Sequence, residues 1–304
     1  MSEEIEVPAT KMESRYRKLK TERSTGEQPK KLAHQVLLAT ETAANTDGLA
    51  SDFAASVAAF ERYEPPIEPF HDFSRPDDSL DGQREKLRES FEDPEKDETR
   101  ASGHQLAARL IDAESKSSGG LPRVSYLDRE IPPGRTQTPF RYETNETKGL
   151  ELDLLFSANG QPVIAEVKAK TDEGAYSALI QALASCAELA SDVQRKRLAK
   201  HSLFSIKALR QKREGSPSQS LPDPVALNES GKLECWIILL FHNENSAERT
   251  TLANVTGEIA QKLMDHPGVN EVISAIRCVD ASIPQEGPVV FTERWKAIGL
   301  GTTA

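Results

Sequence analysis

The 304-residue sequence predicts an α/β protein with a central mixed sheet flanked by helices. Three observations support this fold class. Asn159-Gly160 separates two alternating apolar segments, the strongest short-range signal for a β-hairpin. The run 235–241, CWIILLF, is apolar on both faces, as a central strand requires. Between them, apolar residues recur at helical spacing.

The first 98 residues predict a helical and partly disordered acidic N-terminal extension, and residues 99–304 predict the α/β domain. Residues 1–30 are polar and favour a frayed tail or a short helix. Apolar residues at helical spacing over 31–63, interrupted near 45–48, favour an αα-hairpin. Residues 77–98 are strongly acidic, which is typical of a solvated, partly disordered segment.

The domain then follows in chain order. Ser102 is a suitable N-cap for a helix over 104–114, and Pro132-Pro133-Gly134 ends a strand that begins near Arg123. After the hairpin, Thr171 or Asp172 can cap a single long helix. The remaining predicted elements are the helix 173–200, the strand 235–241, the helix 256–264, the strand 275–279 and an edge strand over 289–296.

The hairpin turn fixes which residues face each other. If Asn159-Gly160 is the two-residue loop, the facing pairs are Ala158 with Gln161, Phe156 with Val163, and Leu154 with Ala165. The same register puts Asp153 opposite Glu166. It puts Glu151 opposite Lys168.

Alternation along the strands assigns these residues to two faces. The four charged residues share one face with Leu155 and Ile164, and we expect this face to be at least half covered. The other face is fully apolar and must be core: Leu152, Leu154, Phe156, Val163, Ala165 and Val167. Two carboxylates directly across a ladder repel each other, so a divalent cation between Asp153 and Glu166 would balance their charges.

This pattern resembles the PD-(D/E)XK nuclease superfamily, in which an acid on one strand precedes acid-x-Lys on the paired strand. Asp153 matches the first acid and Glu166-Val167-Lys168 the second element, and the surrounding residues look most like Holliday-junction-resolvase and Mrr-type members. Leu152 stands where the family often has Pro. The resemblance implies a restriction-endonuclease-like αβββαβ core, which the predicted element order also follows.

The resemblance implies a Mg²⁺-dependent endonuclease acting on DNA, structure-selective or related to defence or repair, with Mn²⁺ able to substitute. Asp153, Glu166 and the carbonyl of Val167 would hold the metal, and Lys168 would assist the attacking water. Accessory roles fall to three residues, although surface positions are favoured for both glutamines: Glu151, Gln181 and Gln105. The alternatives are an RNA nuclease and a catalytically weak nucleic-acid or protein-binding member of the fold. A DNA-mimicking role for the acidic segment 77–98 rests on charge alone.

A basic run predicts where nucleic acid would bind. The net charge is −10, yet no acid interrupts residues 195–213. This local concentration indicates a phosphate-binding face, and a solvated helix end is an equally good interpretation. The residues predicted to contact nucleic acid are Arg195, Lys196, Arg197, Lys200, Lys207, Arg210, Arg135 and Arg141.

The compartment is predicted from cysteine usage and apolar runs. Cys186, Cys235 and Cys278 fit no metal-binding or disulfide spacing, and unpaired cysteines favour a reducing environment. The N-terminus has no apolar signal region, and the longest apolar run is too short to span a bilayer. We therefore expect a cytoplasmic protein without membrane contact, for which a homodimer remains open.

Overall fold

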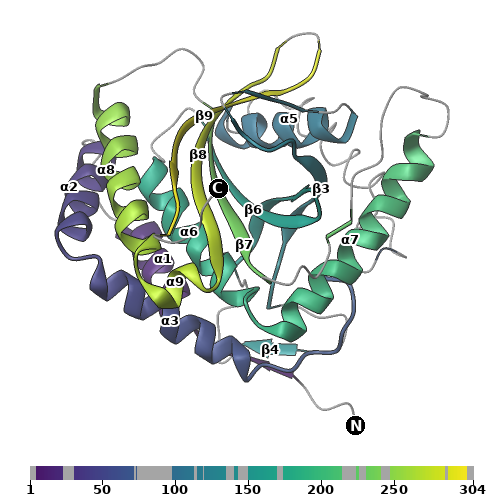
Figure 1. Cartoon of the computed structure of the whole chain (residues 1–304), viewed down its shortest axis with the longest axis horizontal. Coiled ribbons are helices and arrows are strands. Elements are labelled where there is room, and N and C mark those ends of the chain that lie inside the picture. The colour runs from purple at the N-terminus through teal and green to yellow at the C-terminus, as the bar shows by residue number, and fades with distance from the viewer. Residues whose placement is uncertain are drawn as a thin grey trace.

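The computed structural model describes residues 5–22, 31–71, 73, 98–112, 115–118, 120–134, 140–142, 150–169, 174–213, 224–225, 231–240, 247–284 and 287–299. Over these residues the chain is an α/β protein built on a mixed seven-stranded sheet (Figure 1). The predicted fold class is confirmed at this level. No described helix is both long enough and apolar enough to cross a bilayer.

The strands of the large sheet run in the order β2-β9-β8-β7-β6-β5-β3, and β1 and β4 form a separate parallel pair. The strands are β1 Ile5–Val7, β2 Lys116–Ser118, β3 Ser125–Ile131, β4 Phe140–Tyr142, β5 Leu152–Ala158, β6 Gln161–Ala169, β7 Leu233–Leu240, β8 Ile273–Ser282 and β9 Val290–Ala297. The helices are α1 Lys11–Glu22, α2 Lys31–Ala44, α3 Asp47–Glu61, α5 Glu98–Asp112, α6 Ala175–Glu188, α7 Asp192–Arg213, α8 Ala247–Met264 and α9 Pro267–Asn270.

The hairpin β5–β6 has the predicted turn and register. Asn159 and Gly160 have φ angles of 52° and 84°, as a type I′ turn requires at both central residues. The pairs Ala158–Gln161, Phe156–Val163 and Leu154–Ala165 are those expected from the sequence. Strand β3 pairs antiparallel with β5, whereas β6, β7 and β8 run parallel, so the hairpin joins the two parts of a mixed sheet.

Apolar clusters cover both faces of the sheet. One cluster joins Leu155 and Ile164 to α6 and α8, and the other joins Phe156, Ala165 and Trp236 to α5. Leu152, predicted to lie with Leu154, instead belongs to the cluster on the α6 face. All three cysteines are buried.

Helix α7 lies along the side of the sheet where β3 is the edge strand (Figure 1). Its residues enter both apolar clusters: Leu198 and Ile206 on the α6 face, and Leu209 on the α5 face. The helix therefore covers the outer edge of β3, the side on which this strand pairs with no other described strand.

The N-terminal helices pack into the same core as the sheet. Two helices, α2 and α3, form as predicted over this region, but they pack mainly on α8 and α6 and not on each other as an αα-hairpin would. Met12, Ala39 and Phe53 belong to the cluster that contains α6. The boundary at residues 98 and 99 stays a prediction, although segment 1–98 contributes to the core of segment 99–304. Most of the acidic segment 77–98, up to residue 97, lies outside the described residues.

Four predictions about these elements are wrong. Helix α5 begins at Glu98, so Ser102 lies inside the helix and is not its N-cap. The single helix over 173–200 is two helices, because the Ser191 hydroxyl accepts a hydrogen bond from the Gln194 amide at 3.3 Å and starts α7 as an N-cap. Helix α8 begins nine residues before Thr256, at Ala247. Strand β9 is not an edge strand, because β2 pairs with it.

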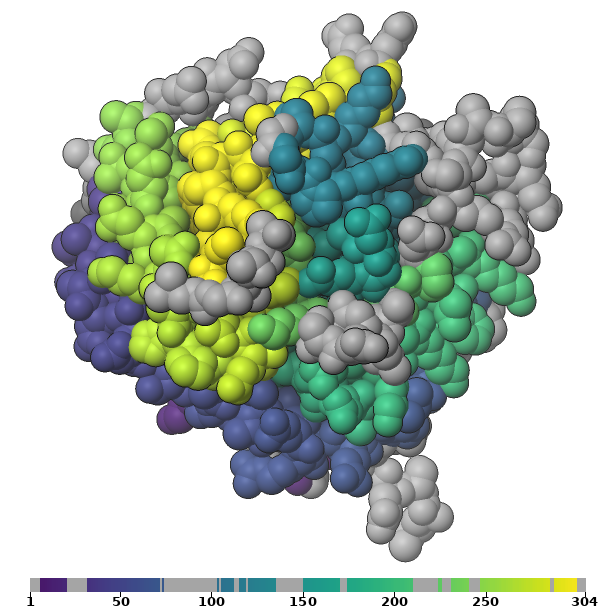
Figure 2. Space-filling view, in the orientation of Figure 1, coloured from purple at the N-terminus to yellow at the C-terminus, as the bar shows by residue number. Residues whose placement is uncertain are grey.

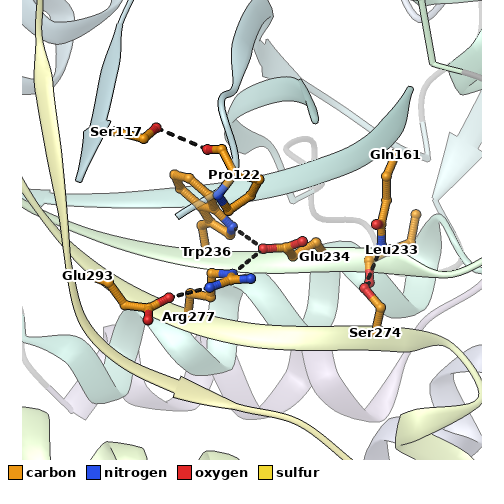
Figure 3. A network of polar contacts seen from close by, with 9 residues as sticks. All are labelled: Ser117, Pro122, Gln161, Leu233, Glu234, Trp236, Ser274, Arg277 and Glu293. Atoms are coloured by element: carbon orange, nitrogen blue, oxygen red, sulfur yellow. Dashed lines mark hydrogen bonds and ion pairs between the residues drawn. The ribbon is translucent and has the colours of Figure 1, made fainter. Parts of the chain in front are cut away.

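A buried polar network fixes the strands β7, β8 and β9 (Figure 3). Arg277 of β8 forms ion pairs with Glu234 of β7 and Glu293 of β9, and the Trp236 indole donates to Glu234 at 2.7 Å. Only 7% of Arg277 and 5% of Glu234 is exposed. These two buried groups carry opposite charges and pair with each other. We interpret this network as structural, since each of its charged groups has an oppositely charged partner.

Candidate active site at the open end of the hairpin

Four polar side chains meet where β5 begins and β6 ends: Asp153, Glu166, Lys168 and Gln181. Glu166 is fully buried, and Lys168 and Gln181 are only 5% and 6% exposed. Asp153 is half-buried, and the neighbouring Glu151 is exposed. The charged face is thus covered, as predicted, and it reaches solvent on the side of Asp153 and Glu151.

At this end of the hairpin, the Asp153 side chain takes the place of a backbone hydrogen bond between the two strands. The last backbone pair between β5 and β6 is Leu154–Ala165, and beyond it Asp153 Oδ2 accepts a hydrogen bond from the Val167 amide at 2.8 Å. The amide and carbonyl of one strand residue point to the same side. The Val167 carbonyl is therefore directed toward β5, the side on which Asp153 lies.

Glu166 is a buried carboxylate without compensation by hydrogen bonds. Neither of its oxygens has a hydrogen-bond partner among the described residues. Burial raises the pKa of Glu166 well above its ordinary value, the negative charge of Asp153 raises it further, and Lys168 lowers it. Such a group is costly as an anion unless a cation is supplied, so its oxygens fit a metal ligand.

Gln181 holds Lys168 in place. The Lys168 ammonium donates to Gln181 Oε1 at 2.9 Å, and Gln181 Nε2 donates to the Glu151 carbonyl at 3.3 Å. The favoured surface position for Gln181 is wrong, because α6 lies flat on the sheet and is buried along its whole length. Gln105 does not join this site: it is exposed on α5, which packs on the opposite face of the sheet.

The basic residues of α7 divide into buried, bonded and exposed members. Arg197 is wrong as a phosphate ligand, because it is fully buried against the Phe70 ring, 4.3 Å from the ring centroid. Arg195 pairs with Asp192 and donates to the Gly231 carbonyl. Of the remaining predicted cations, Lys196, Lys200 and Lys207 are exposed. Arg210 lies in α7 and Arg141 in β4, and Arg135 lies outside the described residues.

A second polar cluster, not predicted from the sequence, lies between β3 and α7. His71, Asp128 and His201 bring one potential ligand atom each within 4.8 Å of one another. The ring nitrogen Nε2 of His201 lies 2.7 Å from Asp128 Oδ2, and that of His71 lies 3.6 Å from the same oxygen. The three residues are too far apart in sequence for any spacing rule to connect them.

The hydrogen bonds of His201 do not fit a metal ligand. Its Nδ1 accepts the Phe70 amide at 3.2 Å, which assigns the ring proton to Nε2, the nitrogen that faces Asp128. A protonated nitrogen donates to the carboxylate and cannot bind a metal. Burial lowers the pKa of His201, so the neutral ring is favoured. Burial alone would raise the pKa of Asp128, but His71, His201 and the Arg129 amide outweigh it and lower that pKa.

Comparison of the chain with protein-family models, with curated proteins and with solved structures found no match. Its function is therefore inferred from the arrangement of its own side chains. The site that combines a buried carboxylate, a second acid and a fixed ammonium group is the one at the open end of the hairpin.

Proposed function

We propose that the chain is a Mg²⁺-dependent nuclease with a restriction-endonuclease-like core. The observation that carries the proposal is Glu166, a buried carboxylate with no hydrogen-bond partner among the described residues, beside Asp153 and Lys168. A purely structural role would leave its buried oxygens without a hydrogen-bond partner, at a cost of roughly 1–3 kcal/mol. A bound catalytic cation would explain why the chain keeps a buried carboxylate at this cost.

The element order supports the same proposal. Within the described residues, α5, β3, β5, β6, α6 and β7 follow the order αβββαβ, apart from the short strands β2 and β4 and the second helix α7, which lies between α6 and β7. Asp153 lies on the second strand of that series, and Glu166 and Lys168 lie on the third. The site also lies at the carboxyl end of β6, the edge at which parallel strands commonly present ligand-binding groups.

The residues that would hold the metal are Asp153, Glu166 and the Val167 carbonyl. This all-oxygen set leaves positions open for water and substrate, as Mg²⁺ prefers. When bound, the ion would stabilise negative charge on the phosphoryl oxygens and acidify a water molecule. Asp153, the half-buried member, lies on the side from which a phosphodiester can enter.

Lys168 would position the attacking water and balance the developing charge. Its ammonium is fixed by Gln181, and Gln181 is fixed by the Glu151 carbonyl, so no reorganisation is needed to present the charge. The positive charge also lowers the pKa of Glu166, which favours the anionic form that a metal needs. Gln181 is thus a positioning residue for Lys168.

A nuclease assay tests this function. Purified protein with Mg²⁺ or Mn²⁺ is incubated with linear, supercoiled, branched and single-stranded DNA, and we expect cleavage of at least one substrate. Asp153→Ala and Lys168→Ala should each abolish it, while Glu41→Gln, which removes an exposed carboxylate on α2, should retain it. Equal cleavage by the wild type and Asp153→Ala would rule out the assignment.

A further inference from the structure

Exposed apolar side chains gather on one side of α7. Among the described residues, the large apolar side chains that are exposed are Leu37, Ile67, Leu203 and Phe204. Leu203 and Phe204 belong to α7, and the Lys200 ammonium donates to the Ile67 carbonyl at 2.9 Å, which brings Ile67 against the same helix. Three of the four therefore lie on or beside α7, which reaches the surface in green at the right of Figure 2.

Cations share this side of the helix. At 3.6 residues per turn, the five exposed residues Lys196, Lys200, Leu203, Phe204 and Lys207 fall within an arc of about 100°. We call this set the α7 stripe. The sequence has no Asp or Glu from 193 to 213, so the stripe is locally positive on a chain of net charge −10. A partner that matches it must carry negative charge and flat or apolar groups together.

Phe204 is the outer end of a row of rings. It stacks on Phe73 with the ring centroids 5.8 Å apart and the planes at 11°, and Phe73 lies 5.1 Å from the ring of His201. Phe204 is 41% exposed, so the row ends at the surface. A further planar ring placed on Phe204 would extend the stack.

The row of rings leads toward the candidate active site. Its inner member, His201, is bonded to Asp128, and Asp128 pairs with Leu155 on the neighbouring strand. Asp153 is two residues from Leu155, so strand geometry puts the Cα atoms of Asp128 and Asp153 roughly 8 Å apart. Asp128, the partner of His201, thus lies on the strand next to the one that carries Asp153, and α7 lies beside that edge strand.

We propose that the α7 stripe binds an unpaired nucleic-acid strand, with a base stacked on Phe204 and phosphates paired with the lysines. A duplex hides the faces of its bases, whereas an unpaired strand offers both a free base face and a charged backbone. The stripe would hold a single-stranded region next to the site of cleavage. This inference rests on the proposed nuclease function and names its substrate class as nucleic acid with an unpaired segment.

Binding is measured apart from cleavage. Full-length protein in EDTA is titrated into labelled 20-nucleotide oligothymidylate, oligouridylate and a blunt 20-base-pair DNA duplex, with fluorescence anisotropy as the readout. We expect the single strands to bind more tightly than the duplex, and Phe204→Ala to weaken them by at least about fivefold. Phe204→Trp should restore binding, and Leu37→Ala, which removes an exposed apolar side chain on α2, should not change it. Preference between the two oligonucleotides identifies DNA or RNA.

The lysines are tested by salt. Lys196→Ala and Lys207→Ala should each reduce the slope of log affinity against log salt by about 0.7, with Lys11→Ala of α1 as the control. Equal binding of duplex and single strand with no effect of Phe204→Ala would overturn the inference, as would Phe204-dependent binding to phosphatidylglycerol vesicles without binding to oligonucleotides. Mg²⁺-dependent cleavage is scored separately. If binding depends on Phe204 but no substrate is cleaved, the nuclease proposal alone is refuted. If a substrate is cleaved but binding of single strands does not depend on Phe204, the α7 inference alone is refuted.

Discussion

Replacing Glu166 by Gln should stabilise the metal-free protein. Glu166 is fully buried, and neither oxygen has a partner among the described residues. Its folded-state pKa lies above the ordinary value of 4.5, first because of burial and then because of Asp153. A raised carboxyl pKa contributes stability that is present below the unfolded pKa and is lost as the pH rises toward the folded pKa. The wild type therefore carries a penalty at neutral pH that Glu166→Gln removes.

The size of the effect follows from the burial. An unsatisfied buried polar group costs about 1–3 kcal/mol, and more if charged. The neutral Gln amide resembles the protonated acid and can donate to Asp153, so we expect a gain of this size at pH 7.5. For a chain of this length it corresponds to a rise in Tm of roughly 2–6 °C. The gain should shrink as the pH is lowered toward 4.5.

Thermal unfolding followed by circular dichroism in EDTA, from pH 5 to 8, measures this difference. Glu188→Gln is the matched control, because Glu188 is also buried with a raised pKa but lies at the C-terminal end of α6, near Glu13 and away from the candidate site. Adding Mg²⁺ should raise the Tm of the wild type and of Glu188→Gln and leave Glu166→Gln unchanged. A Glu166→Gln protein less stable than the wild type at pH 7.5 in EDTA would refute the reasoning.

Three further changes test other parts of the structure. Gln181→Leu should lower kcat and shift the pH–rate profile of Mg²⁺-dependent cleavage by releasing Lys168, with circular dichroism showing an intact fold. Arg277→Ala should cost about 3–5 kcal/mol in urea denaturation, because it leaves Glu234 buried without its cation. His201 has a lowered folded pKa, so stability should fall as the pH drops below its ordinary value of 6.5, and His201→Gln should flatten that slope between pH 7.5 and 5.5.

The hairpin was predictable in detail because its information is local. Asn159-Gly160 fixes the turn, the turn fixes the register, and the period of two assigns Asp153 and Glu166 to one face. The buried strand β7 was equally clear, since all of its residues are covered. The break between α6 and α7 had a local signal too, the Ser191-Asp192 pair, which the continuous apolar stripe concealed.

The remaining features depend on packing between distant segments. Gln181 is buried because of how α6 lies on the sheet, which no periodicity reveals. Arg197 carries a surface charge in sequence terms, yet it donates to the carbonyls of Glu68 and Pro133, from segments more than 60 residues away. The cluster of His71, Asp128 and His201 likewise joins three separate segments.

The shared core of the N-terminal helices and α6 has a consequence for the order of synthesis. Helix α3 ends at Glu61, and its packing partner α6 begins at Ala175. At about 5–20 residues per second, the apolar faces of α1 and α3 wait on the order of ten seconds for that partner. The hairpin, by contrast, can close within about 10 μs of leaving the ribosome. The apolar faces of the helices made first thus wait much longer for their packing partner than those of the hairpin, and this delay gives them more time to aggregate.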